Sequence, residues 1–384
     1  MVQNKKGKHV NSKLIFSLII FSFFKINAYA QSNKWKTGII TDEFIFNTAP
    51  YPECHAATIA ETPKGLVSAW FGGTKERNPD VEIWVSRMVN NKWLKPVSVA
   101  NGVQNDTLRY PTWNPVLFQV PGGSLLLFYK VGPKPADWKG WMIESKDNGV
   151  TWSAPRALPA NFIGPVKNQP VMVGNKIFSP SSTEGDGWKV HFEESADKGK
   201  TWKMIGPIND GKTTKAIQPT VLTYKDGRLQ MLARSKSRAI VESWSNDKGQ
   251  TWSDVTETSL PNNDSGIDGV TLKDGRQLLV YNHVLPPTGQ TKGARTPLNV
   301  AISKDGKEWY AASILEDSPI SQYSYPSVIQ SKDGLVHIVY TWRRKKIKYV
   351  KIDPSKLILV KIENGEWPII SGYTKPAAGT ITND

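Results

Sequence analysis

The chain has 384 residues, of which 39% are hydrophobic and 22% charged, a formal net charge of +15 and one cysteine, Cys54. This length can bury a large core in one or two domains, and a single cysteine excludes a scaffold held by internal disulfides. The positive charge favours an anionic partner, but no basic run alternates with aromatic residues, so we expect no nucleic acid as partner.

Residues 1–30 have the features of a secretory signal peptide: a lysine-rich start, an apolar stretch over 14–24 and Ala-Tyr-Ala at 28–30. The apolar stretch is too short to span a bilayer, so we expect no membrane span. Without the five lysines of this segment the net charge is still +10. We therefore expect a periplasmic or secreted protein whose mature part is residues 31–384.

Two repeated patterns follow along the chain. The motif S-x-D-x-G-x-T-W occurs at 145–152, 195–202 and 245–252, with a shortened copy at 303–309 and a degraded one at 86–93. Its Asp caps a tight turn, its Gly supplies a positive φ, and its Trp is expected to pack between neighbouring sheets. In addition, six pairs of β-rich segments are joined by tight turns at 63–65, 121–123, 174–176, 225–227, 273–275 and 332–334.

Short strands repeated at intervals of about 50 to 60 residues, each unit with an aromatic signature, are typical of propeller blades. We predict an all-β, six-bladed β-propeller as the single domain of residues 31–384, with seven blades as the alternative. Segments 35–46 and 347–367 are expected to complete the ring.

In a propeller, the loop before the first strand and the loop after the second strand of every blade meet on one face. These positions are polar, ionisable or aromatic in every blade, which favours a ligand site over a purely structural ring. The excess of Arg and Lys indicates an anionic ligand, most simply a carboxylate. The positions include Glu53, His55, Trp113, Asn114, Lys130, Lys167, Asn168, Gln169, Ser182, Glu184, Gln218, Arg234, Asp268, Asn282, His283, Tyr323, Tyr325, Arg343 and Arg344.

The repeated motif resembles the Asp-box of the sialidase superfamily, and the resemblance covers essentially the whole mature chain. Sialidases hold a sugar carboxylate with three arginines, use a Tyr–Glu pair as nucleophile and an Asp as acid/base. The resemblance implies that Arg234 and Arg295 are the second and third arginines, that Tyr323 or Tyr325 is the tyrosine, and that Asp80 is the acid.

Two positions depart from the family pattern. The stretch 52–58, with His55 nearest, replaces the first-blade arginine. Gln218 stands where the glutamate belongs, and Gln218 cannot act as a base, although Glu184 in the next blade could substitute. A histidine at the site suggests proton abstraction, as in the similar propeller lyases that act on uronic acids with His and Tyr.

We therefore predict an exo-acting enzyme for acidic, uronic-acid-containing oligosaccharides that works by β-elimination, as a lyase or a dehydratase. His55 would be the base and Tyr323 or Tyr325 the acid. Residues expected to bind the substrate are Arg234, Arg295, Lys130, Lys167, Asn114, Gln218, Glu184, Trp113 and Arg343.

Several alternatives remain at this point. One is an exo-α-sialidase or other retaining glycosidase that uses a tyrosine with Asp80, and another is a glycan-binding propeller without turnover. His55 could merely cap a strand, with His191 or His283 as the base. The run 343–346 is expected to be solvated beyond Arg343. No metal-ligand spacing is recognisable, so we expect no metal or cofactor, and we expect a monomer.

Overall fold

The structure is a computed structural model in which residues 1–2 and 33–370 are described. The expected signal peptide lies outside the described residues, apart from Met1 and Val2. None of the helices within the described part of the chain could span a bilayer.

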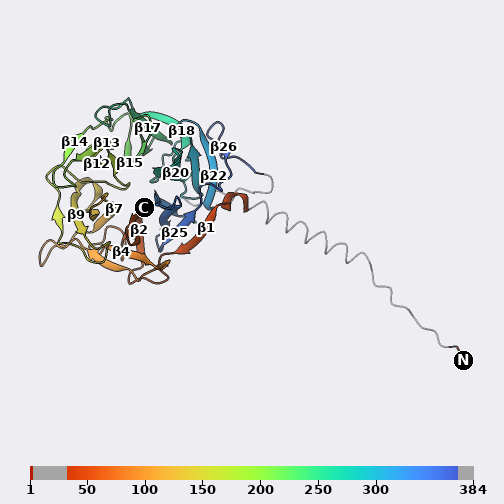
Figure 1. Ribbon diagram of the computed structural model, residues 1–384, viewed down its shortest axis with the longest axis horizontal. Helices are drawn as coiled ribbons and strands as arrows, with labels where there is room; N and C mark the ends of the chain where they lie inside the picture. Colours follow the sequence, from red (N-terminus) through yellow and green to blue (C-terminus); the bar gives the residue numbers. More distant parts are fainter. Residues whose placement is uncertain (3–32, 371–384) are drawn as a thin grey trace.

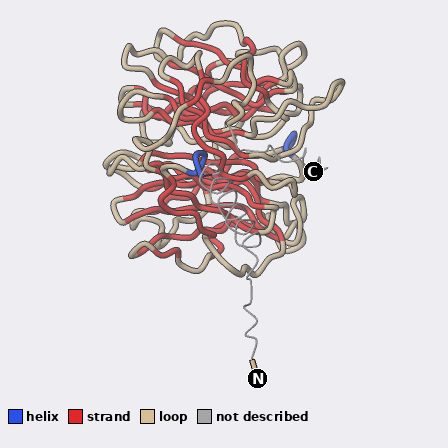
Figure 2. Tube along the Cα trace, turned by 90° about the vertical axis from the view of Figure 1, so that its right-hand side faces the viewer, coloured by secondary structure: helices blue, strands red, loops and turns tan. Residues whose placement is uncertain are grey.

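The described residues form six antiparallel sheets that follow one another around a central axis, as the colour order in Figure 1 shows. Seen from the side, strands are almost the only regular structure, and two short 3-10 helices are η1 (Asn33–Lys36) and η2 (Pro135–Asp137) (Figure 2). The six-bladed propeller is thereby confirmed, and the seven-bladed alternative is not needed.

Blades are numbered along the chain. Blade 1 contains β2 (Glu53–Thr62), β3 (Gly65–Gly73), β4 (Glu82–Val89), β5 (Lys92–Trp93) and β6 (Val97–Ala100). Blade 2 contains β7 (Thr112–Gln119), β8 (Leu125–Val131), β9 (Lys139–Ser145) and β10 (Arg156–Ala157). Blade 3 contains β11 (Val171–Val173), β12 (Lys176–Thr183), β13 (Lys189–Ser195) and β14 (Lys203–Ile205).

Blade 4 contains β15 (Ala216–Thr223), β16 (Leu229–Ser235), β17 (Ala239–Ser245) and β18 (Thr256–Pro261). Blade 5 contains β19 (Asp268–Thr271), β20 (Gln277–Tyr281), β21 (Leu298–Ser303), β22 (Trp309–Glu316) and β26 (Val360–Lys361). Blade 6 contains β23 (Tyr323–Gln330), β24 (Val336–Trp342), β25 (Lys346–Ile352) and, as its outer strand, β1 (Ile39–Phe44).

The repeated motif closes the turn after the third strand of a blade. In the copy at 145–152, Asp147 accepts hydrogen bonds from the backbone N–H groups of Val150 (3.1 Å) and Thr151 (2.9 Å). Gly149 has φ 83°, as the sequence predicts, a conformation that favours glycine. The motif tryptophan of blade 3, Trp202, packs on Phe128 of blade 2, with 5.9 Å between ring centroids.

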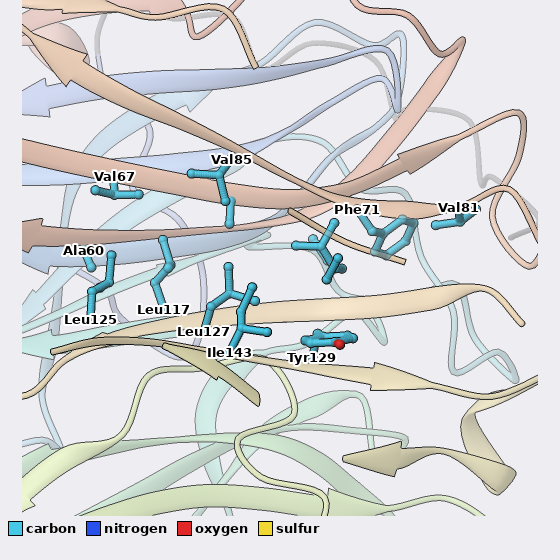
Figure 3. Packing of buried hydrophobic residues seen from close by; sticks show 14 of the residues in the cluster. Ala60, Val67, Phe71, Val81, Val85, Leu117, Leu125, Leu127, Tyr129 and Ile143 are labelled. Atoms are coloured by element: carbon cyan, nitrogen blue, oxygen red, sulfur yellow. The ribbon is translucent and has the colours of Figure 1, made fainter. Parts of the chain in front are cut away.

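The hydrophobic core is divided into six clusters, one between each pair of adjacent blades. Figure 3 shows the cluster between blades 1 and 2, in which Val67 and Val85 of one blade lie near Leu117 and Leu127 of the next. Truncation of such a fully buried leucine typically costs about 2–5 kcal/mol. Each blade is therefore stabilised by both of its neighbours.

The ring is closed by the N-terminal strand. β1 pairs antiparallel with β25, in a register that places Asp42 opposite Val350 and Phe44 opposite Lys348. The ammonium of Lys348 lies 2.6 Å from the Asp42 carboxylate. Segment 35–46 thus completes blade 6, while β26 returns to the outer edge of blade 5.

Candidate active site at the propeller axis

A β-bulge occurs at the same place in four of the inner strands. β2, β7, β15 and β23 all shift register there, and the residue at the bulge has a positive φ: Ala56 (56°), Asn114 (29°), Gln218 (56°) and Tyr325 (53°). A bulge turns a side chain away from the regular ladder. Gln218 and Tyr325 belong to blades that are not adjacent, yet their side chains are hydrogen-bonded, so both reach the axis.

Tyr325 is the centre of the cluster. Its hydroxyl oxygen accepts a hydrogen bond from Arg234 Nη1 (2.8 Å) and another from Gln218 Nε2 (3.1 Å). Arg234 is held in turn by Asp264, whose Oδ1 lies 2.8 Å from Nε, and both side chains are buried. Because a phenol oxygen has two lone pairs, these bonds fill its acceptor capacity and leave its proton for donation elsewhere.

His55 lies against this tyrosine. The two ring centroids are 4.2 Å apart, and the ring planes are inclined by 45°. His55 Nδ1 lies 2.8 Å from Thr341 Oγ1, which also accepts the backbone N–H of Ala56 (3.1 Å). Among the described residues, no hydrogen bond is formed by Nε2 of His55. The imidazole is therefore oriented through one nitrogen only.

Burial and surrounding positive charge both act on the imidazole. Burial lowers the pKa of His55 well below its ordinary value of 6.5, and the charges of Arg344, Arg295, Lys167 and Arg234 lower it further. At neutral pH the ring is therefore uncharged and can accept a proton.

Further cations surround the Tyr325 ring. The guanidinium carbon of Arg295 lies 5.6 Å from the ring centroid, and Arg295 Nη1 donates to Gln322 Oε1 (3.2 Å). The Lys167 ammonium lies 5.7 Å from the same centroid. Several cations are thus gathered around one aromatic ring, as a site for an anion requires.

The two candidate tyrosines lie in different places. Tyr323, two residues before Tyr325 on β23, packs in the cluster between blades 5 and 6. Its hydroxyl accepts hydrogen bonds from Arg343 Nη2 (3.0 Å) and Nε (3.2 Å). Arg343 therefore lies beside Tyr323, whereas Arg234 and Arg295 lie beside Tyr325.

The two candidate lysines bind backbone carbonyl groups. Lys167 Nζ donates to Pro326 O (2.6 Å) and Ile267 O (2.9 Å), and burial lowers the pKa of Lys167 to about 8. Lys130 Nζ donates to Pro165 O, and burial lowers the pKa of Lys130 to about 7. Both ammonium groups thus bind backbone carbonyl groups of neighbouring segments, among them that of Pro326 in β23.

Three other candidates flank the cluster. Trp113 is buried, and its Nε1 donates to Gly132 O (2.8 Å), while Asn114 is the buried bulge residue of blade 2. Glu184 is at the end of β12, where burial raises the pKa of its carboxyl and the positive charge of Arg234 opposes that rise. The charge of Arg234 therefore acts on the Glu184 carboxyl and lowers its pKa, against the larger effect of burial.

Asp80 lies farther out, in the loop 74–80 between β3 and β4. Its Oδ2 accepts hydrogen bonds from the backbone N–H (2.7 Å) and the hydroxyl of Thr74 (2.5 Å), and the residue is exposed. The carboxylate therefore fastens the two ends of the loop to each other.

Other histidines have partners outside the cluster. His191 Nε2 lies 3.1 Å from Glu193, and His283 contacts Tyr281 through Nδ1 (2.6 Å). His337 lies between Ser331 and Tyr349, at 2.8 Å from each hydroxyl. Within residues 1–2 and 33–370, no group of three His, Cys, Asp or Glu side chains could hold a metal ion.

Sequence reasoning missed Thr341, Asp264 and Glu76. Thr341 and Asp264 orient His55 and Arg234, and Arg344 forms an ion pair with Glu76. The expectation that the run 343–346 is solvated beyond Arg343 is wrong for Arg344, whose side chain is only 15% exposed. The repeat carries no signal for it, because the register makes Thr341, and not Arg344, the blade-6 counterpart of Arg234.

Residues 64–338 match the BNR repeat-like domain. The chain belongs to this family. The BNR propeller is also 26% identical over 264 residues to an anhydrosialidase of Macrobdella decora, a match that spans 61% of this chain and 33% of that protein. It is 31% identical over 240 residues to a sialidase of Paraclostridium sordellii, spanning 53% of this chain and 57% of the relative.

The BNR propeller is also similar to a solved structure, the NanB sialidase of Streptococcus pneumoniae. The TM-score is 0.63 at 14% identity, over 83% of this chain and 71% of that one. Together with the family match, this similarity confirms the resemblance to the sialidase superfamily. The matches span from a third to just over half of the two curated relatives' lengths, so the family and the fold are shared, while the reaction remains to be argued from the site.

Proposed function

We propose that this protein is a carbohydrate-active enzyme that binds the carboxylate of an acidic sugar at the propeller axis and removes a proton beside it. The observation that carries the proposal is the contact between the His55 and Tyr325 rings, 4.2 Å apart, inside a cluster of arginines. The preferred substrate is a uronic acid at the non-reducing end of an oligosaccharide, and the reaction is β-elimination.

Arg234 and Arg295 would bind and neutralise the sugar carboxylate. The proton on C5 of a uronate is acidic only when this charge is neutralised, because the electrons released at C5 spread into the carboxyl group. His55 would take this proton at Nε2, in the tautomer in which Nδ1 donates to Thr341.

The electron pair of the C5–H bond then forms the C4–C5 double bond, and the bond from C4 to its oxygen breaks. Tyr325 would give its proton to the departing oxygen, and the resulting phenolate would keep the hydrogen bonds from Arg234 and Gln218. If that oxygen carries a sugar, the enzyme is a lyase; if it is a free hydroxyl, the enzyme is a dehydratase.

Substrate binding would also adjust the base. Burial and, in addition, four nearby cations lower the pKa of His55. A bound carboxylate offsets part of that positive field, which raises the pKa of His55 when it has to accept a proton. Substrate binding would thus make His55 a stronger base.

The second candidate is sialidase-type glycoside hydrolysis or transfer, with Tyr325 as nucleophile and Asp80 as acid. It is favoured by the grouping of Arg234, Arg295 and Tyr325 and by the activities for which the two curated relatives are named. Against it, Gln218 donates to the tyrosine where the resemblance requires a carboxylate, and Asp80 is bound to Thr74.

One experiment separates these reactions and glycan binding without turnover. The protein is incubated with uronate-terminated oligosaccharides and, separately, with sialyllactose, and ultraviolet absorbance and product mass are followed. Elimination gives a conjugated double bond that absorbs, whereas hydrolysis gives free sialic acid without it. Binding with neither product would support a lectin-like role.

Variants then test the assigned residues. We expect His55→Gln and Tyr325→Phe to abolish the absorbing product. Tyr323→Phe is the matched control, because it removes an equally buried, arginine-bonded hydroxyl from the same strand, and it should retain turnover. Loss of turnover in Tyr323→Phe with retention in Tyr325→Phe would contradict the assignment.

A further inference from the structure

We infer that Arg344 is a third guanidinium of the carboxylate site, and that Glu76 occupies it until an acidic sugar takes its place. This inference rests on the proposed function, since it concerns the same axial site. In this inference Arg344 binds the ligand carboxylate, and Glu76 competes with the ligand for Arg344.

The backbone places Arg344 beside the base. Arg344 lies in the turn between β24 and β25, with φ 54°, and its carbonyl oxygen accepts the backbone N–H of Cys54 (2.7 Å). The turn of blade 6 is therefore fastened to the start of β2, one residue before His55. The positive charge of Arg344 acts on His55 more strongly than that of Arg295, Lys167 or Arg234.

Arg344 also supplies what the first blade lacks. The bulge residue of β2 is Ala56, whose methyl group is too short to bind a ligand carboxylate at the axis. Instead, the charge of a guanidinium from the neighbouring blade, that of Arg344, acts on the adjacent His55. The adjacent Arg343 is directed to Tyr323, so the two consecutive arginines serve different places.

One ion-pair partner of Arg344 is on an exposed loop. Glu76 belongs to loop 74–80, whose ends are joined by Asp80 and Thr74 and whose tip forms the local hydrogen bond from Asn78 N to Lys75 O (3.0 Å). The Glu76 side chain is 25% exposed, whereas Asp264, the partner of Arg234, is 2% exposed.

This difference in exposure decides which of the two carboxylates, that of Glu76 or that of Asp264, a ligand can displace from its arginine. Asp264 is enclosed and remains on Arg234, but Glu76 can leave into solvent with little change in the loop base. A partly exposed ion pair is weak, whereas a bidentate pair between a guanidinium and a ligand carboxylate is among the stronger contacts. A sugar carboxylate is therefore expected to displace Glu76 from Arg344.

The test measures binding by calorimetry with methyl glucuronide and N-acetylneuraminic acid as acidic probes and methyl glucoside as the neutral control. We expect Arg344→Gln to weaken binding of the acidic probe about 10- to 100-fold. Lys345→Gln, which removes an exposed charge from the same turn, is the matched control and should bind as the wild type does.

Glu76→Gln provides the second arm. Removing the competing carboxylate should tighten binding of the acidic probe several-fold, and this gain should vanish in the Glu76→Gln, Arg344→Gln double variant. If Arg344→Gln misfolds, as judged by its melting temperature, the Glu76→Gln result alone decides the inference.

Two outcomes would overturn the inference. Unchanged binding in Arg344→Gln, together with loss of binding in Arg234→Gln, removes Arg344 from the site but leaves the proposed function standing. Weaker binding in Glu76→Gln shows that Glu76 assists the ligand instead of competing with it. Failure of the wild-type protein to bind either acidic probe overturns both the inference and the proposed function.

Discussion

Replacement of Gln218 by glutamate changes the charge at the axis with almost no change in shape. Gln218 is 2% exposed, its Nε2 lies 3.1 Å from the Tyr325 hydroxyl, and its Oε1 lies 3.3 Å from Arg234 Nη1. A carboxylate at this position would pair with Arg234 and accept the tyrosine proton. It would therefore compete for both groups that elimination requires.

The expected magnitude follows from the charges. Two like charges about 6 Å apart repel by about 3 kcal/mol at an effective dielectric constant near 20. A substrate carboxylate on Arg234 would be at roughly this separation from the new one, so kcat/KM on a uronate substrate should fall about 100-fold. Redirection of the Tyr325 proton toward the carboxylate should lower kcat as well.

The assay is the rate of ultraviolet absorbance increase with a uronate-terminated oligosaccharide. Gln218→Met is the control, because it removes the hydrogen bonds without adding charge, and its loss should be about tenfold. An unchanged kcat/KM in Gln218→Glu would refute the placement of the substrate carboxylate at Arg234. Release of sialic acid by this variant alone would instead favour the hydrolase.

Three further predictions concern pH and stability. His55→Gln should lower kcat/KM about 100- to 10,000-fold, and the acidic limb of the wild-type profile should lie below pH 6.5, because the pKa of the free base is depressed; a limb at or above 6.5 would contradict this. Burial lowers the pKa of Lys130 to about 7 in the folded protein, so between about pH 7 and pH 10 the unfolded chain binds more protons than the folded one. The contribution of Lys130 therefore makes the free energy of unfolding rise with pH in this window. Denaturant titrations should show a smaller rise in Lys130→Met. The pKa values of Asp147, Asp197 and Asp247 are lowered to about 2, so their contribution is present above pH 4 and is lost as the pH falls toward 2, which circular dichroism during acid titration should show; the triple Asn variant should lose this dependence.

The blades were predictable because their signals are local. The sequence around Asp147, Asp197 and Asp247 contains all the groups that close the turn, so the motif determines its own structure. Every repeat contains apolar strands between its turns, and the six inter-blade clusters follow from that repetition. Even the ring closure by 35–46 could be inferred from what the last blade lacked.

The axial site was predictable only in part. Positions in the repeat identified His55, Gln218, Arg234 and Tyr325, since they depend on which end of a strand meets the axis. The choice between Tyr323 and Tyr325 depends on a bulge, which shifts the alternation by one residue. The sequence carries a weak trace of it, because proline follows the bulge residue at 115, 219 and 326.

Contacts made by loops were not predictable. Glu76 and Arg344 are 268 residues apart, and their pairing depends on the conformations of two turns that the repeat does not determine. The charge of Lys167 suggested ligand binding, but its ammonium group donates to the carbonyl groups of Ile267, in the loop before β19, and Pro326, in β23. Residue type alone does not distinguish a cation that binds a ligand from one that fastens backbone.

The bulge shared by β2, β7, β15 and β23 has a consequence for how this fold evolves. The bulge residue is left out of the ladder, so its side chain can be exchanged without disturbing the hydrogen bonds that hold a blade together. The side chains at positions 56, 114, 218 and 325 can thus be substituted while the strand ladders of the blades are retained. Single substitutions there can give a descendant a new reaction while its blades stay the same, and a small library over these positions is a natural starting point for redesign.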